Sequence, residues 1–114
     1  MKKIVLLLAA CANAREAKRI ARQLVRKRLA ACVNVVPRIE SIYRWKGKME
    51  EASEVLVIVK TTKARAAAAA DEIKKLHSYE LPSIERLEAS VGGEVAAWLD
   101  ESVNASVYRK SRKR

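Results

Sequence analysis

Hydrophobic and polar residues recur along this chain with two different periods, and these periods divide it into strands and helices. Residues 3–11 form an almost unbroken apolar run of strand length, as expected for a strand buried on both faces. Apolar residues then recur three and four positions apart within 13–30, which predicts an amphipathic helix. Helical spacing and propensity predict further helices over 63–77 and 94–103, and alternation predicts a strand over Ile84–Val91.

Residues 31–62 are predicted to form one long β-hairpin. β-branched and aromatic residues fill both arms, and Lys46-Gly47 between them suits a two-residue turn with positive φ. Pro37 cannot donate a ladder hydrogen bond, so the outgoing arm should be an edge strand or carry a bulge there. Arms of about a dozen residues span about 40 Å, whereas typical strands have about five or six residues. A single chain of 114 residues offers little to cover such a ribbon, so we expect self-association.

The predicted element order is β-α-β-β-α-β followed by a C-terminal helix. This is the ferredoxin-like α+β arrangement, a four-stranded antiparallel sheet with helices on one face. The outgoing hairpin arm would be an edge strand, and the return arm, apolar on both faces, would be interior. We expect one such domain over 1–103 and a basic, mobile C-terminal tail over 104–114. Cys11 and Cys32 would lie at opposite ends of non-adjacent strands, so we expect no disulfide between them.

Positive charge is concentrated in two segments. The formal net charge is +11, and it comes from 13–30, with seven Lys/Arg and one Glu, and from 104–114, with five Lys/Arg and no acid. Such segments permit contact with nucleic acid or anionic lipid, although they are more often a solvated surface. RNA-recognition domains share the predicted order but stack bases on aromatic residues of strands one and three, and 4–10 and 55–59 contain none. We therefore expect no nucleic-acid partner, and binding through the tail stays an alternative.

The N-terminal residues resemble a bacterial lipoprotein signal, because Lys2 and Lys3 precede an apolar run that ends at Cys11. That run is at the short limit for a signal and far too short to span a membrane, so we expect a buried first strand and no membrane partner. Two cysteines are too few for a disulfide scaffold and match no zinc spacing, which suits a reducing compartment. Few Asn and Gln beside many charged residues are typical of thermostable proteins.

Four short segments carry a resemblance to a known family. They are LAACVN at 29–34, YRWKGK at 43–48, VKTT at 59–62 and HSYELP at 77–82. In their order and spacing the chain resembles the CutA divalent-cation tolerance proteins over roughly 3–103. The resemblance implies a ferredoxin-like fold, a tight homotrimer of interlocked hairpins, a cytoplasmic location and a role in heavy-metal tolerance, with copper the usual ion.

The candidate metal ligands are His77, Glu80 and Cys11. His77 is the only histidine, and imidazole suits copper and zinc, while a thiolate suits Cu(I). Some family members bind copper through a cysteine near the end of the first strand, which implies a role for Cys11, although the aligned position falls nearer Ala9. Glu80 is a candidate ligand or hydrogen-bond partner of His77. The alternatives are a His77 that faces the helix dipole and a Glu80 in a solvated loop. We expect copper or another divalent ion to bind weakly.

A second candidate site is a cleft between subunits that holds a small ligand. Its proposed lining is Tyr43, Trp45, Tyr79, Lys60 and Cys32. Aromatic residues on a long hairpin more often pack at an interface, and a small buried apolar role is the simplest one for Cys32. The acidic cluster of Glu50, Glu51 and Glu54 suggests only a solvated turn. A trimeric small-molecule sensor is therefore an alternative function. No catalytic triad, phosphate-binding loop or pair of catalytic carboxylates stands out, so an enzyme is not indicated.

Overall fold

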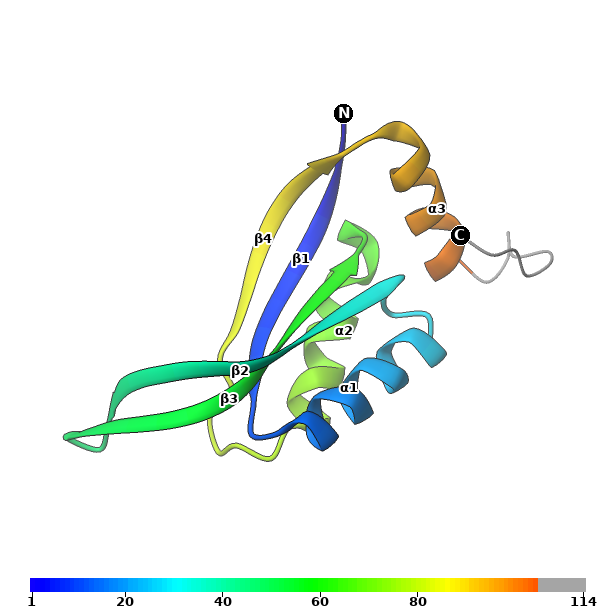
Figure 1. The fold of residues 1–114 in the computed structure, drawn as a ribbon. Coiled ribbons are helices and arrows are strands. Elements are labelled where there is room, and N and C mark those ends of the chain that lie inside the picture. The colour runs from blue at the N-terminus through cyan, green and yellow to red at the C-terminus, as the bar shows by residue number, and fades with distance from the viewer. Residues whose placement is uncertain (105–114) are drawn as a thin grey trace.

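The computed structural model describes residues 1–104, which form four strands and three helices (Figure 1). In chain order these are β1 (Lys2–Cys11), α1 (Ala14–Arg26), β2 (Cys32–Trp45), β3 (Lys48–Thr61), α2 (Lys63–Leu76), β4 (Ile84–Val91) and α3 (Gly93–Val103). The predicted order of elements is confirmed. Residues 105–114, which make up nearly all of the predicted basic tail, lie outside the described residues.

The four strands form one antiparallel sheet in the order β2-β3-β1-β4. This order confirms the ferredoxin-like α+β class, with β2 at an edge and β3 in the interior, as the two hairpin arms predicted. The apolar run that resembles a signal sequence is β1, which pairs with β3 on one side and with β4 on the other. Within residues 1–104, the helices are too short or too polar to cross a bilayer.

The β2-β3 hairpin projects well beyond the other elements, and the molecule measures 50 × 26 × 22 Å (Figure 1). Lys46 and Gly47 form its turn with φ values of 51° and 81°, the positive values that a two-residue turn requires. The pairing register shifts between Val36 and Ile39, where Arg38 has a φ of 60°. The bulge expected at Pro37 is therefore present. It reverses which residues of β2 face each side of the sheet.

One face of the sheet forms the hydrophobic core with α1 and α2. Alternate residues of β1 and β3 point to this covered face, because successive side chains of a strand point to opposite sides. Those between Val5 and Cys11 and between Val55 and Val59 are almost completely buried. The core set is Val5, Leu7, Ala9, Cys11, Val55, Val57 and Val59 from the strands, with Ala17, Ile20, Leu24, Ala66, Ala69 and Ile73 from the two helices.

The opposite face of the sheet, called here the open face, is covered by neither α1 nor α2. Helix α3 packs only at one end of it, beside Ile4 and Lys60. Along the rest of this face the apolar side chains are only partly buried or exposed; they include Leu6, Leu8, Val36, Leu56, Ile58 and Leu87. A single chain therefore leaves one apolar side of its sheet in contact with water.

Two helices end earlier than the sequence pattern predicts. Helix α1 ends at Arg26 rather than near residue 30, because Arg28 adopts a φ of 58° and the left-handed conformation ends a helix. Leu29 still packs against the core. Helix α2 ends at Leu76, and His77 follows in an extended conformation. This early end turns the His77 ring back toward β1.

Candidate metal centre and adjoining groove

The first turn of α1 holds Glu16 against the end of β1. Asn13 caps the helix, and its Oδ1 accepts a hydrogen bond from the Glu16 backbone N–H at 2.8 Å. The Glu16 side chain turns back, and its Oε2 accepts a hydrogen bond from the backbone N–H of Ala12 at 3.0 Å. This is a capping box in which the return bond is displaced by one residue. It keeps the Glu16 carboxylate inside the fold, where the residue is only 6% exposed.

His77 reaches the same place from the end of α2. Its Nε2 lies 2.8 Å from the carbonyl oxygen of Ala10, and its Nδ1 accepts a hydrogen bond from the backbone N–H of Tyr79 at 3.1 Å. A carbonyl can only accept and Nδ1 is already an acceptor, so this pattern assigns a neutral ring with its proton on Nε2. Both nitrogens of the buried ring therefore have backbone partners.

Cys11, the last residue of β1, completes the group. Its side chain is fully buried, and it forms no disulfide. Burial raises the pKa of the Cys11 thiol to about 11, and the nearby Glu16 and Glu54 carboxylates add to the increase. Near neutral pH this side chain is therefore a protonated thiol.

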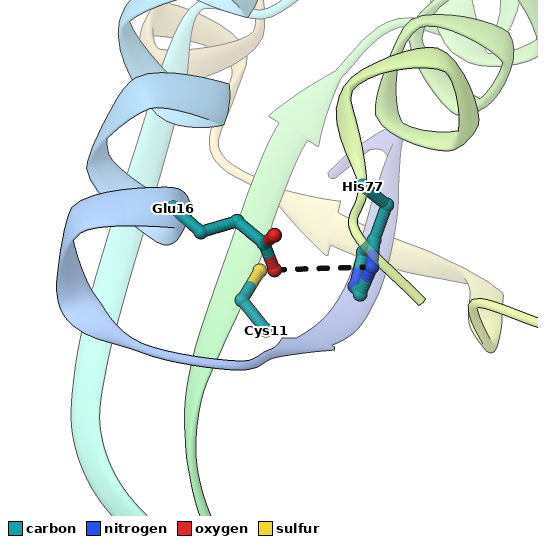
Figure 2. A group of neighbouring side chains, drawn as sticks. All are labelled: Cys11, Glu16 and His77. Atoms are coloured by element: carbon teal, nitrogen blue, oxygen red, sulfur yellow. Dashed lines mark ion pairs between the residues drawn. The ribbon is translucent and has the colours of Figure 1, made fainter. Parts of the chain in front are cut away.

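Figure 2 shows the side chains of Cys11, Glu16 and His77 converging from β1, α1 and the end of α2. Their potential ligand atoms all lie within 4.8 Å of one another. Glu16 Oε2 lies 3.8 Å from His77 Nδ1, and Glu16 Oε1 accepts a hydrogen bond from the backbone N–H of Ser78 at 3.0 Å. Burial alone would raise the pKa of Glu16, but the hydrogen bonds from Ser78 and Ala12 and the neighbouring His77 lower it overall. The cluster therefore contains one carboxylate, one neutral imidazole and one thiol.

By donor type this cluster fits copper or zinc, since thiolate, imidazole and carboxylate are all ligands of these ions. An incoming ion must displace existing interactions, however. Cys11 must lose its proton and His77 must give up a hydrogen bond to Ala10 or Tyr79. The bond to Ala10 joins the end of α2 to β1, and its loss, like deprotonation of the buried thiol, opposes metal binding and favours a low affinity.

The structure does not bring Glu80, the other ligand candidate from the sequence, into this cluster. Its side chain is 75% exposed, and its Oε1 lies 4.0 Å from Lys46 Nζ at the hairpin turn. Glu16 contributes the carboxylate instead. The sequence did not indicate Glu16 as a ligand, because its partner Ser78 lies 62 positions away along the chain. No local pattern indicates that proximity.

A groove of about 570 Å³ adjoins the cluster on the open face of the sheet. Tyr43, Trp45 and Tyr79 line it, so three of the predicted cleft residues share one concave surface. The Tyr79 hydroxyl donates a hydrogen bond to Glu54 Oε2 at 2.6 Å. Burial, with this hydrogen bond and the charge of Glu54, raises the pKa of Tyr79 above its usual value. The remaining lining residues are Ala10, Ser41, Ser78, Glu80, Leu81 and Ser83.

Glu54 differs from the solvated turn residue that the sequence suggested. It is only 7% exposed, because it lies beside the hairpin bulge and beneath Tyr79 rather than at the turn. Lys60 and Cys32 are paired across β3 and β2 at the end of the hairpin far from the turn, and Lys60 lines a different hollow of about 600 Å³ next to α3. The structure therefore divides the five predicted cleft residues between the two ends of the hairpin.

The sheet order and the projecting hairpin define a ferredoxin-like protein with a polar cluster at the end of its first strand. The family model described as CutA1 divalent ion tolerance protein matches residues 5–102. This chain belongs to the CutA1 family, as the four sequence segments predicted.

Known relatives agree with this assignment. The chain is 49% identical to the human protein CutA over 82 residues, which cover 72% of this chain and 46% of the human protein. It is 46% identical over 89 residues to the divalent-cation tolerance protein CutA of Archaeoglobus fulgidus, covering 77% of this chain and 86% of that protein. A solved CutA structure from the same organism, described as a periplasmic divalent cation tolerance protein, has a TM-score of 0.84 at 39% identity, covering 90% and 100% of the two chains.

The matched region does not extend over the whole of every relative. The chain spans about half the length of the vertebrate relatives that it matches. These relatives are named CutA or named for cation tolerance, and none of these names refers to an enzymatic reaction.

Proposed function

We propose that this chain forms a homotrimer that binds copper or another divalent cation weakly and acts, without catalysis, in the cellular response to metal ions. The convergence of Cys11, Glu16 and His77 carries the metal part of the proposal, in a family named for divalent-cation tolerance. Cys11 and His77 would supply the soft and borderline ligands that copper prefers. Glu16 would be a third ligand or the partner that orients His77.

Calorimetric titration of the full chain with Cu²⁺ tests this site. We expect His77→Ala to lose most of the binding heat, because the chain contains no second histidine to replace it. Glu80→Gln is the matched control, since Glu80 was a ligand candidate but lies outside the cluster, and it should bind as wild type. A parallel Zn²⁺ titration separates binding from oxidation of the thiol by copper. An isotherm unchanged by His77→Ala would remove the cluster from the proposal.

The homotrimer is supported by two surfaces that a single chain leaves incomplete. The long hairpin projects from the domain with β2 as an unpaired edge (Figure 1). The open face exposes apolar side chains such as Leu8 and Ile58, although a soluble domain normally buries a continuous apolar sheet surface. A second and third copy of the same chain would cover both, since each copy offers the same edge and the same face.

Light scattering on the full chain tests the assembly. The proposal predicts a mass of about three times the 12.7 kDa of one chain at micromolar concentration. A monomeric mass under these conditions would contradict it, whatever the outcome of the metal titration.

A trimeric small-molecule sensor is a second candidate function, and the aromatic groove beside the cluster favours it. Binding of nucleic acid through the basic tail rests on residues outside the described structure. A chain truncated after Val103 should lose any oligonucleotide binding seen at low salt, and equal binding by both forms would exclude the tail.

We also propose a cytoplasmic location, which the two free cysteines support because thiols persist in a reducing compartment. Cell fractionation tests it, and recovery of the chain outside the cytoplasm would contradict it. The solved archaeal relative is described as periplasmic.

A further inference from the structure

The groove on the open face combines aromatic walls with carboxylates. Tyr43, Trp45 and Tyr79 line it together with Glu54 and Glu80, and among the described residues no lysine or arginine lines it. The chain as a whole has a net charge of +11. A volume of about 570 Å³ lies within the range of small-molecule sites, roughly 300–1,000 Å³. An acidic and aromatic hollow on a basic chain favours a cationic ligand.

Glu54 is the groove residue that most lacks a positive partner. It is 7% exposed, and within residues 1–104 no lysine or arginine forms an ion pair with it. The hydroxyl of Tyr79 gives it one hydrogen bond, at 2.6 Å, which holds the carboxylate and the ring together. A carboxylate withdrawn from water is unfavourable unless a cation compensates it, so a ligand cation at this position would be stabilised.

At the rim of the groove, the ammonium group of Lys46 lies near both an aromatic ring and a carboxylate. Lys46 Nζ lies 5.7 Å from the centroid of the Trp45 ring and 4.0 Å from Glu80 Oε1. These are the separations of a cation–π contact and of a long ion pair. Deeper in the groove, Tyr79 and Glu54 offer the same combination of an aromatic ring and a carboxylate, and no ammonium group of the described residues pairs with it.

We propose that this groove binds a small organic cation, a primary alkylammonium whose head contacts Glu54 and whose apolar chain lies along Tyr43 and Leu81. A primary ammonium fits better than a quaternary one, because a carboxylate accepts more hydrogen bonds than the one from Tyr79. A bare divalent metal fits less well, since one buried carboxylate with phenol groups supplies too few anionic ligands. This proposal deepens the small-molecule candidate function and rests on it. Its contacts differ from the donors of the copper site, which lie on the covered side of β1.

Hexylammonium is the probe, and NMR of the indole N–H of Trp45 in the full chain is the readout. Hexanol and hexanoate, with the same alkyl length, are the neutral and anionic controls. We expect a saturable shift with hexylammonium, none with hexanoate, and binding about ten- to a hundredfold weaker in Glu54→Gln. Glu51→Gln removes the same charge from the same strand, but its exposed side chain points to the other face, so it should bind as wild type.

Three results would overturn the proposal: binding of hexanol as tight as that of hexylammonium, equal binding by Glu54→Gln and wild type, or no response because a neighbouring copy fills the groove. Thermal melts establish that Glu54→Gln is folded. Trp45→Leu is a second variant that leaves Glu54 in place, and its binding is followed at the Tyr79 amide. We expect it to bind about two- to thirtyfold more weakly, because it removes the aromatic wall.

Discussion

The two faces of the sheet differ in how completely their polar side chains are paired, and the difference is sharpest at the end of β1. On the covered face, Cys11 lies beneath α1 and α2, and both nitrogens of the neighbouring His77 have backbone partners. On the open face, Ala10 lines a groove in which aromatic rings are exposed and a carboxylate has no ion pair among the described residues. Two adjacent residues of β1 therefore belong to different sites: Cys11 to the buried cluster and Ala10 to the groove.

The comparison shows that residue type alone does not define a binding site. Cysteine, histidine and glutamate on the covered face are suitable metal ligands, but each already contributes to the folded structure, so metal binding competes with stability. On the open face, Tyr43, Trp45 and Tyr79 in the groove each leave more than a third of their surface exposed in the single chain. The two sites share one segment, because Tyr79 donates its backbone N–H to His77 and its hydroxyl to Glu54.

The largest effect should come from truncating the same residue type on the two faces. Leu7 is 1% exposed in the core, and Leu8 points to the open face. Leu7→Ala should lower the free energy of unfolding by about 2–5 kcal/mol at every protein concentration. Leu8→Ala should act mainly through the assembly, so its effect should depend on protein concentration. Urea denaturation at two concentrations measures both, and equal, concentration-independent losses would remove the distinction between the faces.

An intermediate effect is expected from Glu16→Gln. The two carboxylate oxygens accept hydrogen bonds from the backbone of Ala12 and Ser78, and an amide has only one oxygen to replace them. One buried N–H then lacks a partner, which should cost about 1–3 kcal/mol of stability. Glu88→Gln, which removes only an exposed ion pair with Lys3, should stay within about 0.5 kcal/mol of wild type. Similar denaturation curves for the two variants would show that the cluster does not stabilise the covered face.

The smallest effect concerns the ion pair that joins the two helices on the covered face. Lys27 Nζ lies 2.7 Å from Glu72 Oε2, and this hydrogen bond is the main reason that the pKa of Glu72 is lowered. A carboxyl pKa that is lower in the folded state contributes stability above its unfolded value, and the contribution is lost as the pH falls through the folded value. Wild type should therefore exceed Glu72→Gln in stability at neutral pH, and the difference should shrink at an acidic pH below the unfolded value. Denaturation at both values checks this, and a difference independent of pH would contradict it.

The sequence predicted the fold well because local patterns carry it. The turn at Gly47, the bulge near Pro37 and the buried β1 strand each follow from residue types a few positions apart. The candidate sites were less predictable, because they join distant segments. Glu16 meets Ser78 and Glu54 meets Tyr79 only after the sheet and helices have packed.

The ligand set of bound copper is the most direct test of the proposed metal site. X-ray absorption at the copper edge, on the full chain loaded with one equivalent of copper, should show sulfur and imidazole ligands together. The sulfur signal should disappear in Cys11→Ser and persist in Cys32→Ser, because Cys32 lies at the far end of the hairpin from its turn. A spectrum with neither sulfur nor imidazole, or a sulfur signal lost only in Cys32→Ser, would contradict a metal site at Cys11, Glu16 and His77.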